Sequence, residues 1–331
     1  MKAVPRRARL AGWAAGLVAA SLVVGVAANA STTTTTAAAS CQAGGYDGAT
    51  LSLTCQVPQA TLTVAGPTVT ATATATATTT RTVTATATAT VTVAPAPPLP
   101  AGWTRVAFFD DFTAGLAKWN VRNNTWASNE LSIVTNRPVN VFTDGQVLTL
   151  RAQREVYTAF STTRQYTSAY LDTIGRGSWQ YGRFEMRAKL PASKGLWPAF
   201  WLRNNTGLGE LDIMEAVGGT GKSVQTVHQS TNGDLAKLGH EDAGTADLTA
   251  WRVYAVERAP GVIRWFIDDR LVFTVTTATA PWLDTTFNEP MNIRLNLQVG
   301  GAMPRWYGLD VDASTVLPAD YVIDWVRVLS S

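Results

Sequence analysis

The sequence predicts an all-β fold, a β-sandwich of the jelly-roll type, over residues 103–331. Short runs of alternating apolar and polar residues follow one another through this part of the chain. Turn signals such as Asp144-Gly145 and Asp268-Asp269 separate the runs, and no long stretch has helical periodicity. Many short strands in about 230 residues are typical of two packed sheets, one of which can bend into a concave cleft.

The alternating runs place the strands of this sandwich. Each is four to eight residues long and contains Val, Ile, Leu or aromatic side chains, as expected for strands. They cover residues 147–150, 182–188, 253–256, 263–267, 291–297 and 321–328.

Residues 1–30 have the pattern of a secretory signal peptide. Four basic residues precede an apolar run at 10–28, which ends in the small-residue site Ala28-Asn29-Ala30. The alternative is an uncleaved membrane anchor, because the apolar run is long. Cleavage would lower the formal net charge from +3 by four, to −1. We therefore expect secretion without stable membrane insertion, and no nucleic-acid partner.

Two segments connect this signal to the globular part. Residues 31–60 contain the only two cysteines, Cys41 and Cys55, and we expect a disulfide between them, worth about 3 kcal/mol in the chain-entropy model. This segment is either a small module cross-linked by the disulfide or a spacer. Residues 61–102 are rich in Thr, Ala and Pro, which favours a disordered linker over an aggregation-prone β segment.

The most informative stretch is Trp-Pro-Ala-Phe-Trp-Leu at 197–202, followed by Glu210, Asp212 and Glu215. Side chains alternate faces in a regular strand, so Glu215 would point away from the other two acids. A β-bulge at 213–214 inserts one residue and brings all three carboxylates to one face. We therefore expect an irregular strand with its acids on the concave face.

Crowded carboxylates raise one another's pKa, which keeps one protonated while another stays ionised. Glycoside hydrolysis uses this division between a general acid and a nucleophile, and retaining enzymes place the two carboxyl groups about 5–5.5 Å apart. The alternative is an acidic surface strand or a cation site, because this spacing of acids also arises by chance.

The Trp-rich strand and the acidic motif resemble the signature of family 16 glycoside hydrolases. The likeness extends over the globular part, with landmarks in chain order at Phe109-Asp110-Asp111-Phe112, Asn129-Glu130-Leu131, Tyr181-Gly182-Arg183-Phe184-Glu185, Asn296-Leu297-Gln298-Val299-Gly300-Gly301 and Asp324-Trp325-Val326-Arg327-Val328. The resemblance implies a concanavalin A-like jelly roll whose concave substrate cleft binds a polysaccharide and cuts it with retention of configuration.

On this resemblance, Glu210 is the nucleophile, Glu215 is the general acid and later the base, and Asp212 hydrogen-bonds the nucleophile. The six-residue, bulged form of the motif is that of laminarinase-like members, which favours β-1,3-glucan. The chain departs from their pattern at 207–209, Tyr170 and Met303. Because these positions line sugar sites in the family, the substrate can also be another glycan that family 16 enzymes cut.

Several further side chains are candidates for substrate binding. Trp197 and Trp201 share a strand face and can stack on sugar rings, although a Trp in a sandwich is more often core. His228 has either a cleft role or a structural role, and Asn129 and Glu130 would contact sugar hydroxyls by analogy with the family. We assign Trp265 to the core and His240 to a loop.

Two predictions concern charged residues on the strands. Asp324 occupies a place where family members often hold a structural Ca²⁺; its oxygens suit calcium, although one Asp does not make a site. Catalysis is expected to need no cofactor. Arg183 and Glu185 either line the cleft or pair with each other, and we favour pairing.

The sequence thus predicts a secreted, monomeric, endo-acting retaining hydrolase of β-glucan, with laminarin-type β-1,3-glucan as the favoured substrate. One alternative is another family 16 substrate, a mixed-linkage glucan or a galactan. A second is a wall-glycan transglycosylase, and a third is a non-catalytic carbohydrate-binding protein. Binding-only relatives typically lack one of the acids, and this chain has all three.

Overall fold

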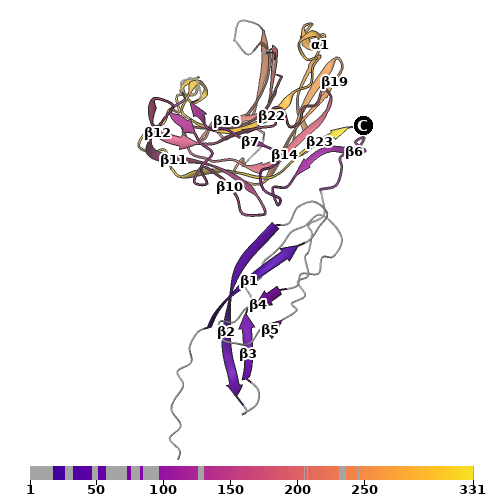
Figure 1. Ribbon diagram of the computed structural model, residues 1–331. Helices are drawn as coiled ribbons and strands as arrows, with labels where there is room; N and C mark the ends of the chain where they lie inside the picture. The colour runs from indigo at the N-terminus through magenta and orange to yellow at the C-terminus, as the bar shows by residue number, and fades with distance from the viewer. Residues whose placement is uncertain are drawn as a thin grey trace, which may run out of the picture. The chain divides into compact units, whose positions relative to one another are not determined.

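The computed structural model describes residues 97–125, 130–204, 206, 208–230, 236–244 and 247–330, together with the backbone of five strands before residue 97. The chain divides into two compact units, Met1–Ala96 and Pro97–Ser331, which Figure 1 shows. Among the described residues the second unit has two helices, both short: α1 (Leu283–Thr286) and α2 (Ala302–Trp306).

The first unit is an antiparallel sheet. Its strands are β1 (Val18–Val26), β2 (Thr33–Tyr46), β3 (Leu51–Gln56), β4 (Ala73–Ala75) and β5 (Val83–Thr84), in the order β3-β2-β1-β4-β5. The register pairs the backbone of Cys41 with that of Cys55, a separation that suits a disulfide. The signal peptide, the disulfide and the linker stay predictions.

The second unit begins at Pro97, before the predicted boundary at Trp103. Nη1 of Arg327 donates hydrogen bonds to the carbonyl oxygens of Pro97 and Pro98, at 2.9 and 3.2 Å. Trp103 Nε1 donates to Glu257 Oε1 at 3.1 Å. These contacts attach the end of the Pro-rich stretch to the second unit.

One sheet of the second unit has eleven strands. They are β6 (Arg105–Asp110), β8 (Asn124–Thr125), β9 (Ser132–Val134), β10 (Val141–Thr143), β11 (Leu148–Ala159), β12 (Thr162–Ser168), β14 (Gly182–Lys189), β19 (Arg252–Ala259), β20 (Val262–Ile267), β21 (Arg270–Thr276) and β23 (Ala319–Ser330). Their order is β21-β20-β19-β14-β23-β11-β12-β9-β8, with β10 beside β11 and β6 beside β23.

The other sheet has seven strands and carries the site. In spatial order they are β18 (Lys237–Asp242), β17 (Ser223–Ser230), β16 (Leu208–Ala216), β15 (Leu196–Arg203), β22 (Asn292–Val299), β13 (Tyr170–Asp172) and β7 (Asn120–Val121). All six strands predicted from alternation are present, as β11, β14, β19, β20, β22 and β23. The all-β prediction is confirmed.

The core lies between these two sheets, because each strand turns one apolar face inward. Phe184 and Met186 of β14 and Ile293 and Leu295 of β22 are all 0% exposed and belong to one cluster. Burying such a side chain stabilises the fold by about 1.5–3 kcal/mol. The polar residues of β22 alternate with these and lie on the opposite face of the sheet, so the seven-stranded sheet has a polar outer face.

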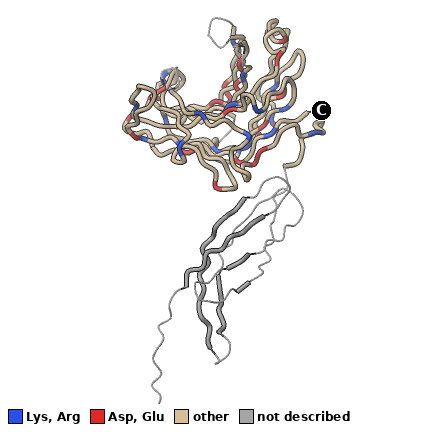
Figure 2. The backbone as a smooth tube through the Cα atoms, in the orientation of Figure 1, with Lys and Arg blue, Asp and Glu red and all other residues tan. Residues whose placement is uncertain are grey.

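Charged residues of both signs are interspersed along the strands of the second unit, as Figure 2 shows. No helix within the described ranges is long and apolar enough to span a membrane.

Candidate active site

Strand β16 is irregular between Asp212 and Glu215. On one side, β15 passes directly from pairing with Met214 to pairing with Asp212, which leaves Ile213 without a register partner on that strand. On the other side, β17 takes two residue steps while β16 takes three, from Asp212 to Glu215. The predicted β-bulge is therefore confirmed.

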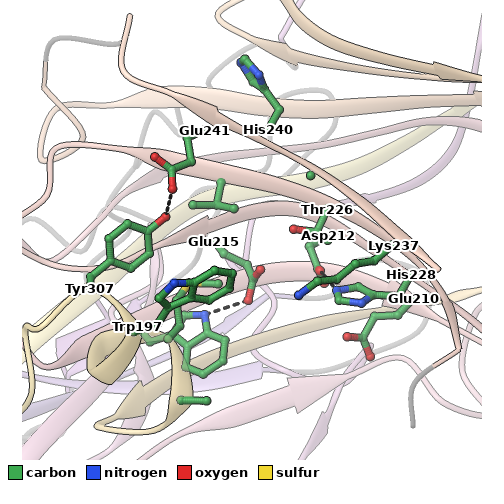
Figure 3. Close-up of a pocket in the computed structure, with 15 residues that line it drawn as sticks. Trp197, Glu210, Asp212, Glu215, Thr226, His228, Lys237, His240, Glu241 and Tyr307 are labelled. Carbon is green, nitrogen blue, oxygen red and sulfur yellow. Dashed lines mark hydrogen bonds and ion pairs between the residues drawn. The ribbon is translucent and has the colours of Figure 1, made fainter. Parts of the chain in front are cut away.

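The bulge separates the acids from the apolar residues of β16. Ile213 and Met214 are consecutive, yet both are buried in the core between the sheets. Glu210, Asp212 and Glu215 all line one cavity of about 530 Å³ (Figure 3). The extra residue changes the parity of the strand, so that the last acid returns to the face of the first two.

A buried tryptophan on the eleven-stranded sheet is hydrogen-bonded to the backbone of the bulge. Nε1 of Trp265, on β20, donates a hydrogen bond of 2.9 Å to the backbone carbonyl of Asp212, and Trp265 is 0% exposed. A bulge removes backbone groups from the regular ladder, and a buried carbonyl needs a partner. Sequence reasoning placed Trp265 correctly in the core, but gave no signal for this contact.

Burial raises the pKa of all three carboxyls. For Asp212 and Glu215 the pKa lies well above the ordinary value, because the charge of a neighbouring acid adds to the effect of burial. The pKa of Glu210 is also raised by burial, but His228, when protonated, and the permanent charges of Arg203 and Arg294 oppose the rise. Glu210 is therefore the member of the trio that ionises most readily.

A hydrogen bond fixes the position of Glu215 in the cavity. Trp197 Nε1 donates to Glu215 Oε1 at 2.8 Å, as Figure 3 shows. Trp197 also lines the cavity, so the same indole offers a ring face to a ligand and a donor to the acid.

His228 joins the acids from the neighbouring strand β17. Its Nε2 lies 3.1 Å from Asp212 Oδ2, and burial lowers its pKa, so it is neutral at physiological pH. The sheet register aligns Arg203, Glu210, His228 and Lys237 in one row across four strands. Arg203 Nη1 lies 3.9 Å from Glu210 Oε2, which places a cation beside this acid.

These carboxylates, arranged on a bulged strand of a curved sheet, can be compared with known proteins. Residues 127–327 match the family model "Glycosyl hydrolases family 16". The chain belongs to glycoside hydrolase family 16.

Two relatives and one solved structure illustrate the similarity. A β-glucanase of Rhodothermus marinus is 38% identical over 233 residues, which cover 64% of this chain and 78% of the relative. Glucan endo-1,3-β-glucosidase A1 of Niallia circulans is 31% identical over 255 residues, 66% of this chain and 36% of that longer protein. The crystal structure of the laminarinase from Rhodothermus marinus has a TM-score of 0.60 and 35% identity, and covers 69% of this chain and 97% of that one.

In this family 16 enzyme, Trp201 does not line the cavity that the three acids share, and its contact with sugar stays a prediction. The ring lies in a small cluster with Tyr170 and is 6% exposed. Its Nε1 donates to Asn296 Oδ1 at 2.7 Å, and the guanidinium of Arg294 lies 4.9 Å from its ring centroid. Tyr170 of β13 and Asn296 and Arg294 of β22 therefore cover this indole. Its place in the alternation of β15 had predicted that it faces the cleft.

Three other predicted binding residues have different outcomes. His228 lines the cavity, and its contact with sugar stays a prediction. Asn129 lies outside the described residues, and its contact with sugar stays a prediction. Glu130 is 0% exposed and does not line the cavity. His240 was expected in a loop, which is wrong: it lies in β18, lines the cavity and stacks on Phe273 with ring centroids 5.5 Å apart.

The carboxylate of Asp324 lies on the eleven-stranded sheet, paired with the guanidinium of Arg187. Among the described residues, the one cluster with ligating side chains close enough for a metal ion is Glu210, Asp212 and His228. The structure gives Asp324 a cationic partner, and the calcium site there stays a prediction.

Arg183 and Glu185 pair, as predicted. Arg183 Nε lies 2.6 Å from Glu185 Oε1, and both side chains are buried. The side chains that line the cavity and that sequence reasoning missed include Lys237, Glu241, Trp306 and Tyr307. They come from an edge strand and from the segment after β22, and no spacing in the sequence relates them to the acids.

Proposed function

We propose that this family 16 enzyme is a secreted, endo-acting hydrolase of β-1,3-glucan that retains the anomeric configuration. The observation that carries the proposal is the bulge in β16, which brings Glu210 and Glu215 to one cavity. The names of two relatives support the linkage, since one is a glucan endo-1,3-β-glucosidase and the other a laminarinase.

The reaction proceeds in two displacements. The ionised carboxylate of Glu210 attacks the anomeric carbon while Glu215 gives its proton to the glycosidic oxygen, so the C–O bond breaks and the leaving sugar departs as an alcohol. A glycosyl ester on Glu210 remains. Glu215, now ionised, takes a proton from water as the water attacks the same carbon, which releases the sugar and restores both groups.

The surroundings of the two acids suit these roles. Burial and the nearby Asp212 raise the pKa of Glu215, which keeps the proton it must donate. Cations beside Glu210 favour its ionised form. Carboxylate oxygens of Asp212 and Glu210 lie within 4.8 Å of each other, so a protonated Asp212 can donate a hydrogen bond to the nucleophile as the two approach.

A polysaccharide panel with product sizing tests the proposal. We expect short oligosaccharides from laminarin, smaller yields from lichenan, and no products from agarose or carrageenan. NMR of the first products should show the β-anomer. Glu210→Gln should abolish turnover while binding persists. Binding of laminarin without any release of reducing ends would identify a lectin, and an α-anomer would contradict retention.

A transglycosylase shares the covalent intermediate, and differs in whether a sugar or water arrives second. Product analysis at high acceptor concentration separates the two: longer products in place of hydrolysis would favour transfer.

Export, the disulfide and independence from cofactors belong to the same proposal. Expression with an export pathway should yield a monomeric chain that begins after Ala30, and non-reducing mass analysis should show Cys41 joined to Cys55. Chelators should leave laminarin hydrolysis unchanged. Retention of residues 1–30 in the mature protein would contradict cleavage and favour the anchor.

A further inference from the structure

Two side-chain contacts join β18 to the segment that includes α2. The hydroxyl of Tyr307 donates a hydrogen bond to Glu241 Oε1, as Figure 3 shows. Nζ of Lys237 lies 5.3 Å from the ring centroid of Trp306, within the range of a cation–π contact. We call these four residues the clasp. All four line the same cavity as the three acids.

The order of the strands shows what the clasp crosses. β17, β16 and β15 separate β18 from β22, and α2 follows directly after β22. At about 4.8 Å per strand step, β18 and β22 lie about 19 Å apart within the sheet. Side chains of β18 and α2 can touch only if the two elements rise from the concave face and approach each other above β16. The clasp therefore covers the catalytic strand.

The exposure of the acids agrees with this cover. Asp212 is 4% exposed and Glu215 is 7% exposed, although a polysaccharide must reach them. The cavity of about 530 Å³ has the size of a small-ligand site, about 300–1,000 Å³. The Glu210 side chain, by contrast, is 22% exposed, so the cavity is more closed around Asp212 and Glu215 than around Glu210.

The clasp has a fixed base and an outer side that faces solvent. The turn before α2 uses Gly300 and Gly301 at φ 68° and 110°, and Gly300 N donates to the carbonyl of Gly195 at 2.7 Å. Trp306, by contrast, is 77% exposed, and the Glu241 carboxylate also pairs with Lys222 at 2.9 Å. The contacts can therefore break and reform without disturbing the core.

We propose that the clasp makes this enzyme select unbranched glucan chains. A linear chain lies on the floor formed by Trp197 and the acids, beneath the clasp. A single sugar linked as a side branch on the bound stretch would collide with Trp306 or Tyr307. This inference rests on the proposed function and adds a substrate preference to it.

The test compares kcat/KM for linear β-1,3-gluco-oligosaccharides with that for β-1,3-glucan carrying single β-1,6-linked glucosyl branches. Tyr307→Phe removes the hydrogen bond to Glu241, and Lys237→Met removes the charge over Trp306. Loss of a hydrogen bond to a charged group should raise the equilibrium constant for opening of the clasp about tenfold. We expect the branched-to-linear ratio to rise about five- to tenfold in Tyr307→Phe, and further in the double variant.

Tyr166→Phe is the matched control, because the Tyr166 hydroxyl bonds Arg154 at 3.1 Å on an exposed surface that does not line the cavity. Its ratio should equal that of the wild type. Thermal unfolding of each variant checks that it is folded. Equal ratios in the wild type and all clasp variants, or a wild type that cuts branched and linear chains equally, would overturn the clasp but leave the proposed function standing. Loss of hydrolysis on every glucan would instead overturn the proposed function.

Discussion

Trp197 Nε1 lies 2.8 Å from Oε1 of Glu215, so a residue expected to stack on sugar also holds the proposed general acid. A hydrogen bond to a carboxylate favours its ionised form, and this contact lowers the pKa that burial raises. The proton affinity of Glu215 therefore depends on an indole that also contributes to the cavity wall.

Replacing Trp197 with Phe should shift the basic limb of the pH–rate profile to higher pH. Without its donor the ionised form of Glu215 is less stable, so its pKa rises further, and kcat should fall about 10- to 100-fold because the acid loses its fixed position. Trp103→Phe is the control, since it also removes an indole–carboxylate hydrogen bond, at 3.1 Å to Glu257, but outside the cavity. An unchanged basic limb in Trp197→Phe would contradict the role of this contact.

The dependence of kcat/KM on pH should be bell-shaped. Activity needs Glu215 protonated, so it is lost as the pH rises through the raised pKa of Glu215; it needs Glu210 ionised, so it is lost as the pH falls through the pKa of Glu210.

The Arg203→Gln variant should move only one of the two limbs of this pH profile. Removing this cation raises the pKa of Glu210, because its charge opposes the effect of burial, so the acidic limb should move to higher pH while the basic limb stays in place. Arg154→Gln, on an exposed surface, should move neither limb. Equal displacement of both limbs in Arg203→Gln would argue against the assignment of the nucleophile.

Removing the hydrogen bond from Trp265 should destabilise the bulge. Trp265→Phe leaves the buried carbonyl of Asp212 without its donor, which costs about 1–3 kcal/mol of unfolding free energy, and should lower kcat as the acids shift. The control is Tyr254→Phe, because the Tyr254 hydroxyl is buried and has no hydrogen-bond partner among the described residues. Urea unfolding should show Tyr254→Phe to be neutral or stabilising. Equal effects from the two variants would contradict the contact.

Glu130 should make stability depend on pH. It is 0% exposed, its Oε2 has no partner within the described part of the chain, and burial raises its pKa to about 8. Because the folded state holds this proton more tightly than the unfolded chain, the stabilisation is present at low pH and is lost as the pH rises toward 8.

Glu130→Gln keeps a neutral side chain at every pH. Its stability relative to the wild type should therefore rise between pH 5 and pH 9, by an amount on the order of 3 kcal/mol. Glu155→Gln is the contrasting control, because Glu155 is ion-paired with Arg137 and its pKa is lowered. Urea unfolding at both pH values measures the difference. A constant difference between Glu130→Gln and the wild type would show that Glu130 does not titrate in this range.

The sequence by itself determined the strands, the face of the acids and the bulge. Alternation is a local property, and it fixed β14 and β22 because each residue's face follows from its neighbours along the same strand. The bulge followed in the same way, since only an extra residue allows both Ile213 and Met214 to enter the core while Glu215 joins Asp212.

Only the tertiary structure decided which side chains surround the acids. Tyr170 and Arg294 cover Trp201, although its parity matched that of Trp197. Lys237 and Trp306, far apart in the chain, meet at the wall of the cavity. Such contacts depend on the order and curvature of the sheet, which no local pattern encodes. The catalytic strand could therefore be predicted from its own residues, whereas the walls and the cover of its cavity could not.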